Sequence, residues 1–104
     1  MPYQKTVIST IPDPSTLHYF QTTESKQIFR LIVELSRAYK DKIIAYEKYK
    51  DRTTVITKTT YESKQISDEF DAIIYQTFPD YQAQRDAYNS QHNITFTMSG
   101  KEVD

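Results

Sequence analysis

Few residues in this sequence are of types that carry out chemistry near neutral pH. It has two histidines and no cysteine, which excludes disulfides and thiolate metal sites. His18 stands between Leu17 and Tyr19 in a β-like segment, where an imidazole could act as a general base. The alternative is a surface or core histidine that only hydrogen-bonds to a neighbouring residue. His92 stands in a polar turn far along the chain, and two separated histidines do not predict a metal site.

Tyrosine is the second residue type that could serve a site. Nine residues are tyrosine, whereas tryptophan is absent. Tyr46, Tyr49 and Tyr61 could line an aromatic cavity for a flat organic molecule. The alternative is that these tyrosines cover a small sheet and hydrogen-bond through their hydroxyls.

Charge and glycine content exclude several classes of site. The net charge is −1 and glycine occurs once, so neither a basic phosphate-binding face nor a glycine-rich phosphate loop is expected. No apolar run reaches the length that crosses a bilayer, and the first ten residues lack the pattern of a signal peptide. We therefore expect a cytoplasmic protein that binds neither nucleic acid nor a membrane.

The start of the chain differs from the rest. Thr6 to Ser9 form a short β-like stretch, which Pro12 and Pro14 then interrupt. We expect residues 1–15 to be an N-terminal extension, either an extra edge strand or an arm that reaches a partner. Residues 16–104 have the length and composition of one small domain.

Strands and helices alternate along that domain. Strands are predicted at Thr16–Thr22, Lys42–Tyr49, Thr53–Thr60 and Asn93–Ser99, with Gly100 ending the last one. Helices are predicted between residues 23 and 39, from Glu62 to Pro79, and over Tyr81–Ser90, because apolar residues recur there every three or four positions. The carboxylates Asp68, Glu69 and Asp71 fit a solvated outer side of the second helix.

The resulting order is β-α-β-β-α-β. It predicts an α+β, ferredoxin-like fold, in which an antiparallel sheet carries both helices on one face. The segment Glu24-Ser25-Lys26-Gln27-Ile28 recurs as Glu62-Ser63-Lys64-Gln65-Ile66. Each copy follows a predicted strand, so the two halves look similar, although polar helix starts can also match by chance.

The middle of the chain carries a recognisable pattern. Ile44-Ala45-Tyr46-Glu47-Lys48-Tyr49 is followed by a turn, by Thr54-Val55-Ile56-Thr57-Lys58, by Thr60-Tyr61-Glu62-Ser63-Lys64-Gln65, and then by Phe70. Over residues 16–101 this resembles the antibiotic biosynthesis monooxygenase-like family. The resemblance implies a homodimer of ferredoxin-like subunits, a dimeric α+β barrel, with a pocket between sheet and helices.

Some members of that family oxidise aromatic polyketides with oxygen and no cofactor, so the resemblance implies none here. If the protein acts in this way, His18 is the candidate catalytic base, and Tyr46, Tyr61 and Phe70 are the candidate ligand-binding residues. Tyr61 stands where the family has tryptophan, which keeps a flat ring but loses the indole N–H. Haem-degrading relatives need a histidine on the second helix, and this sequence has none between residues 62 and 78.

Three functions therefore compete. The first is a monooxygenase-like dimer that binds a small aromatic or quinone-type molecule and oxidises it without a cofactor. The second is a non-catalytic protein-interaction or regulatory module, for which a tyrosine-rich surface is suited. The third, single-stranded RNA binding on the open sheet face, is disfavoured by the neutral charge.

Overall fold

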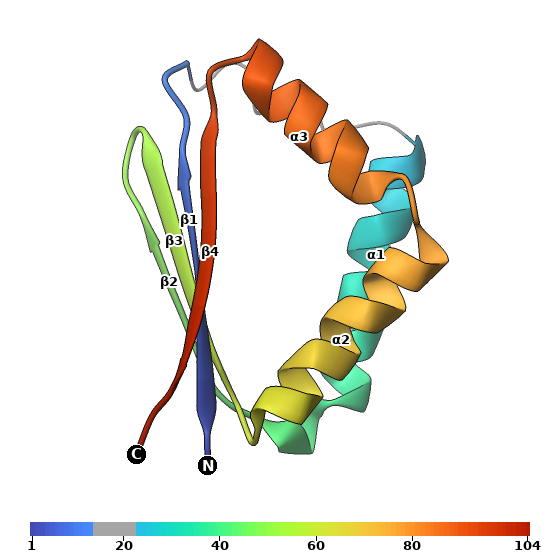
Figure 1. The fold of residues 1–104 in the computed structure, drawn as a ribbon, viewed down its shortest axis with the longest axis vertical. Helices are drawn as coiled ribbons and strands as arrows, with labels where there is room; N and C mark the ends of the chain where they lie inside the picture. The colour runs from blue at the N-terminus through green and yellow to red at the C-terminus, as the bar shows by residue number, and fades with distance from the viewer. Residues whose placement is uncertain (14–22) are drawn as a thin grey trace.

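A computed structural model of the chain describes residues 1–13 and 23–104, which form a sheet with helices on one face (Figure 1). In chain order the elements are β1 (Tyr3–Thr10), α1 (Thr23–Ala38), the short 3-10 helix η2 (Lys40–Lys42), β2 (Ile43–Lys50), β3 (Thr54–Tyr61), α2 (Lys64–Thr77), α3 (Tyr81–Gln91) and β4 (Thr95–Glu102). The predicted ferredoxin-like α+β class is confirmed.

The four described strands are antiparallel and lie in the order β2-β3-β1-β4. The sequence predicted an edge strand or an arm within residues 1–15, and this is wrong, because β1 pairs with β3 on one side and β4 on the other. Val7, for example, stands opposite Thr57 and Met98. Pro12 follows the strand, where it removes no ladder hydrogen bond. The strand predicted at residues 16–22 lies outside the described residues.

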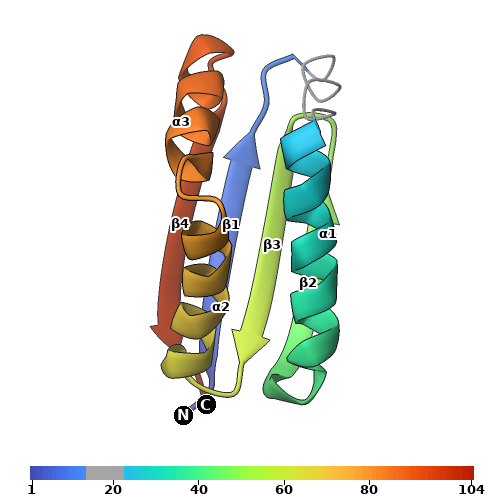
Figure 2. The ribbon, with the colours of Figure 1, turned by 90° about the vertical axis from the view of Figure 1, so that its right-hand side faces the viewer.

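The helices cover one face of this sheet. In Figure 2, α1 lies over β2 and β3, whereas α2 and α3 lie over β1 and β4. The core joining the layers is small, and its buried members are Leu35, Tyr61, Phe70 and Ile74. Leu35, Phe70 and Ile74 occupy helix positions that the three- and four-residue spacing predicted, whereas Tyr61 comes from β3. Within the described ranges, no helix is both long and apolar enough to cross a bilayer.

Local signals in the sequence set the ends of these helices. Ser63 is the N-cap of α2, and its hydroxyl accepts from the Ile66 N–H at 3.4 Å, as serine commonly does at this position. After α3, Asn93 has φ 56°, a left-handed conformation that asparagine tolerates. The Ile94 N–H then donates to the Asn89 carbonyl at 2.8 Å. This turn directs the chain into β4.

The last strand is longer than predicted. Gly100 was expected to end it, but β4 continues to Glu102, and Gly100 stands opposite Lys5 of β1. A Cβ added at Gly100 would overlap the hydroxyl end of the Tyr3 ring. The glycine therefore makes room for a neighbouring aromatic side chain inside the ladder, a use of glycine known from strand interiors.

Candidate functional site

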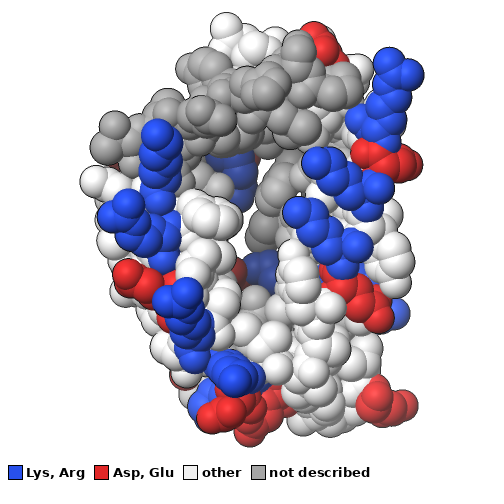
Figure 3. Space-filling model, turned by 180° about the vertical axis from the view of Figure 1, so that it is seen from behind, with Lys and Arg blue, Asp and Glu red and all other residues white. Residues whose placement is uncertain are grey.

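A cavity lies between the helices and the edge of the sheet. Tyr46 pairs with Thr59 and Ile43 pairs with Tyr61, so these side chains share the face that looks toward the helices. Together with residues of α1, η2 and α2 they enclose about 480 Å³. The lining residues are Ile32, Ser36, Lys40, Ile43, Tyr46, Thr59, Tyr61 and Phe70. Figure 3, seen from the side of α1 and β2, shows a hollow between the helices and the sheet.

The floor of this cavity is aromatic. Tyr61 is 5% exposed and Phe70 is 7% exposed, and their ring centroids are 5.9 Å apart. Tyr39 meets Phe70 edge-on, with centroids 6.0 Å apart. Tyr46 is 60% exposed and stands at the opening. The structure thus brings together the three residues that the sequence nominated for ligand binding, in a cavity of the size that small-molecule sites have.

Tyr49 does not join them, although the sequence grouped it with Tyr46 and Tyr61. It pairs with Ile56, which places it on the sheet face that the helices leave open. Its hydroxyl donates to the Glu47 carboxylate at 3.1 Å. That hydrogen bond, together with the negative charge of Glu47, raises the pKa of the Tyr49 phenol. Residues an odd number of positions apart in a regular strand point to opposite faces.

Tyr61 is a hydrogen-bond donor rather than a base. Burial, with a smaller effect from the Asp71 carboxylate, raises the pKa of its phenol from 10.0 to about 12. Burial disfavours the charged phenolate, and a nearby negative charge disfavours it further. The hydroxyl therefore keeps its proton at neutral pH and can act as a hydrogen-bond donor.

An ion pair connects the two layers next to this floor. The Lys5 ammonium of β1 donates to the Asp71 carboxylate of α2, and both side chains are largely shielded from solvent. The sequence placed Asp71 on the solvated side of its helix with Asp68 and Glu69, and for Asp71 this is wrong. Asp71 follows Phe70 and Ser67 on the buried side of α2. Its partner comes from a strand that the sequence did not expect in the sheet interior.

Arg85 is a largely shielded cation that sequence reasoning missed. Its side chain is 11% exposed, and its guanidinium lies 4.4 Å from the centre of the Phe96 ring. It donates to the Tyr75 hydroxyl at 3.2 Å, whereas its Nε has no hydrogen-bond partner among the described residues. The sequence does set this residue apart, because Arg85 is the single Lys or Arg between Lys64 and Lys101.

The structure describes one of the two histidines, His92. His18, the candidate base, lies outside the described residues. His92 follows α3, and its ring lies 4.3 Å from that of Tyr88. In residues 1–13 and 23–104, no group of three or more His, Asp or Glu side chains is placed to hold a metal ion.

Known proteins resemble this chain in structure rather than in sequence. No family model and no curated protein matches it. A Deinococcus radiodurans protein, provisionally named an antibiotic biosynthesis monooxygenase, superposes with a TM-score of 0.52 at 12% identity over 100% of this chain and 93% of its own. A dimeric ferredoxin-like protein from an uncultured marine organism gives 0.55 at 14% identity, over 97% and 91%.

A conserved Methanosarcina mazei Go1 protein is similar to the same degree, with a TM-score of 0.55 at 8% identity over 100% of this chain and 95% of that one. At such low identities the likeness concerns the fold. The sequence resemblance to monooxygenase-like proteins is confirmed at this level, and the chain has the ferredoxin-like fold that these proteins share.

Proposed function

We propose that this protein binds a small aromatic or quinone-type molecule in the cavity beside Tyr61 and Phe70, and oxidises it as a monooxygenase-like enzyme. The observation that carries the proposal is that Tyr46, Tyr61 and Phe70, chosen from the sequence, all line one cavity. The two buried rings form an apolar floor for a flat molecule, and the Tyr61 hydroxyl offers a proton to one of its oxygens.

The proposed reaction needs a base, oxygen and little water. A base removes a proton from an activated ring carbon, and the carbanion then donates electrons to O₂ and forms a carbon–oxygen bond. Loss of water leaves a ketone, so that a CH₂ group and O₂ become C=O and H₂O. No resident cofactor enters this balance. His18 is the proposed base, because an imidazole titrates near neutral pH.

Oxygen consumption with an anthrone or a hydroxyquinone tests this proposal. We expect the purified protein to consume oxygen in proportion to substrate, and His18→Gln to lose that activity while still quenching the fluorescence of a bound quinone. Phe70→Leu, which keeps an apolar side chain but removes the ring, should weaken quinone binding by roughly 1 kcal/mol. If the wild type neither binds quinones nor consumes oxygen, the proposal is wrong.

We propose further that the working form is a homodimer joined through the open face of the sheet. Register places Ile8, Ile56 and Tyr49 side by side on that face. Ile8 is 37% exposed and Tyr49 is 54% exposed, so an apolar strip crosses the sheet where no helix covers it. The structurally similar marine protein is named as dimeric, which supports a homodimer.

A non-catalytic interaction module is the second candidate, because β2 is an edge strand with exposed side chains. Ile44 is 59% exposed and Tyr46 is 60% exposed, and an open strand edge can accept a strand from another protein. Saturable quinone binding that Tyr61→Ala abolishes would favour the first candidate over this one. We retain the predicted cytoplasmic location in both proposals, since a chain without cysteine needs no oxidising compartment.

A further inference from the structure

The charges around the cavity are uneven, and we infer from them that its ligand is an organic anion, such as an aromatic carboxylate or an ionised phenol. This inference deepens the proposed function and rests on it. It depends on which side chains face the space between the sheet and the helices, and on which of them have partners.

The strand register places lysine side chains on the sheet face that looks toward that space. On β2, Tyr46 lines the cavity opposite Thr59. Two and four residues further along, Lys48 and Lys50 stand on the same face, because side chains alternate along a strand. Lys40, in η2 at the other end of β2, is itself a lining residue of the cavity. Lysines therefore lie along the opening on both sides of Tyr46.

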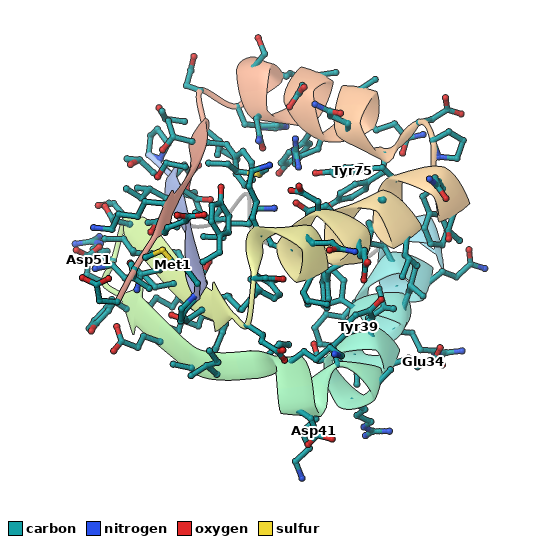
Figure 4. The ribbon with its side chains drawn as sticks, turned by 60° about the horizontal axis from the view of Figure 1, so that its bottom comes forward. Met1, Glu34, Tyr39, Asp41, Asp51 and Tyr75 are labelled. Carbon is teal, nitrogen blue, oxygen red and sulfur yellow. The ribbon has the colours of Figure 1, made fainter. Side chains whose placement is uncertain are left out.

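Carboxylates do not neutralise this row. Figure 4 shows that Glu34, Asp41 and Asp51 point away from the space between the layers, whereas Tyr39 and Tyr75 point into it. Asp51 is also held by the backbone N–H groups of the hairpin turn. In the described parts of the chain, no ion pair is formed by Lys40, Lys48 or Lys50.

The remaining acidic groups are already paired or distant. Asp71 is engaged by Lys5, and Glu62 lies 4.0 Å from Lys42. By register, Glu102 faces the helices too, but it belongs to β4 on the opposite edge of the sheet. Arg85 lies in the same interlayer space, against Phe96, but it is already paired with the exposed Asp86.

Although the net charge of the chain is −1, its positive and negative side chains are therefore unevenly distributed. In Figure 3, Lys and Arg side chains gather along both rims of the hollow, with some acidic ones among them. Such a rim raises the local concentration of anions and speeds their entry, an effect that salt screens. With apolar rings below and ammonium groups above, the cavity complements a flat ring that carries a negative group at its edge.

Two probes of the same shape separate charge from ring. 2-Naphthoate is ionised at pH 7.5 and 2-naphthamide is neutral, so calorimetric titration of each into the full-length protein isolates the effect of the charge. We expect naphthoate to bind roughly three- to tenfold more tightly than naphthamide at 20 mM salt, and the ratio to approach one at about 500 mM.

Charge-removing variants locate the effect. The double variant Lys40→Gln/Lys48→Gln should lower the naphthoate-to-naphthamide ratio by roughly threefold or more. Lys58→Gln/Lys101→Gln, on the open face of β3 and β4, removes the same number of charges and is the matched control, which should leave the ratio unchanged. An equal loss in both variants would overturn the inference, because the attraction would then be general rather than local.

The remaining outcomes distinguish the inference from the function on which it rests. If both probes bind equally well and without dependence on salt, the anion preference is wrong and the aromatic cavity stands. If neither probe binds, the proposed function fails and the inference falls with it. Circular dichroism of each variant ensures that a lost signal reports binding rather than unfolding.

Discussion

Arg85 is largely desolvated, but the Tyr75 hydroxyl and the Asp86 carboxylate offset this and raise the pKa of its guanidinium. Its guanidinium stacks on Phe96 at 4.4 Å, and its closest carboxylate is that of the adjacent, exposed Asp86 at 3.5 Å. Removing a cation from water costs free energy even when it is paired, and apolar replacements of similar volume are often neutral or stabilising. The stacking on the ring recovers only part of that cost.

Replacing Arg85 with methionine should therefore not destabilise the fold. We expect Arg85→Met to leave the free energy of unfolding within about 1 kcal/mol of the wild type, or to raise it. Urea denaturation followed by circular dichroism measures this, with the exposed Arg37→Met as the matched control. A loss of roughly 3 kcal/mol or more would show instead that the guanidinium is a structural anchor.

Tyr61 predicts how the protein responds to alkali. Because folding raises the pKa of its phenol from 10.0 to about 12, its contribution to stability is complete below pH 10 and is lost as the pH rises toward 12. Tyr61→Phe should reduce the loss of stability over this range, whereas Tyr46→Phe, at an exposed ring, should not. Denaturation midpoints at pH 9 and pH 11 measure the difference. An identical alkaline response in wild type and Tyr61→Phe would contradict the assignment.

The hairpin between β2 and β3 depends on one carboxylate. Asp51 accepts the Thr53 N–H at 2.9 Å and the Thr54 N–H at 2.7 Å, and these bonds lower the pKa of its carboxyl group below 3.8. The stabilisation is therefore present above about pH 4 and is lost as the pH falls through the lowered pKa. The connecting residues Asp51-Arg52-Thr53 contain no Asn-Gly or Asp-Gly pair, and the Asp51 side chain stabilises the turn instead.

Removing that carboxylate should loosen the hairpin locally. In Asp51→Ala we expect faster hydrogen exchange at the Thr53 and Thr54 amides, and an acid response of these amides that is smaller than in the wild type. NMR exchange between pH 3 and pH 6 measures both. Asp41→Ala, outside the hairpin, is the control, and equal acceleration in the two variants would count against this role of Asp51.

At the scale of elements, the sequence predicted what periodicity can encode. The apolar spacing from Ile28 to Leu35 and from Ile66 to Ile74 marked the core faces of α1 and α2 correctly. Tyr46, Tyr61 and Phe70 line one cavity, whereas Tyr49, which the sequence grouped with the other two tyrosines, lies on the opposite face of the sheet. The expected edge strand failed because a short β-like run carries no information about its neighbours in the sheet.

The positions of Asp71, which faces the sheet, and of the largely shielded Arg85 were missed for a different reason. Both are charged residues in helices, and the ordinary position of such residues is on the solvated side. Their actual environment depends on partners that are distant in sequence, Lys5 for Asp71 and Phe96 for Arg85. No local pattern in the chain specifies those pairings.

At the scale of the molecule, the open face of the sheet predicts self-association. If two copies bury the strip formed by Ile8, Ile56 and Tyr49, then Ile8→Lys places an unpaired charge in the interface and should weaken the dimer by roughly 100-fold. Light scattering during gel filtration measures the mass across a dilution series. Gln76→Lys, at an exposed position of α2, is the control. A wild-type protein that remains monomeric at high concentration would contradict the proposed dimer.

The position of β1 also has a consequence for the order of folding. β1 comes before the other strands in the sequence. It nevertheless pairs with β3 on one side and with β4 on the other, where Tyr3 stands opposite Glu102. The Val103 N–H donates to the Pro2 carbonyl at 2.9 Å, and the two ends lie together in Figure 1. During synthesis β1 can pair with β3 once residues 54–61 have been made, but its other side must wait for residues 95–102, so the sheet closes late and slowly.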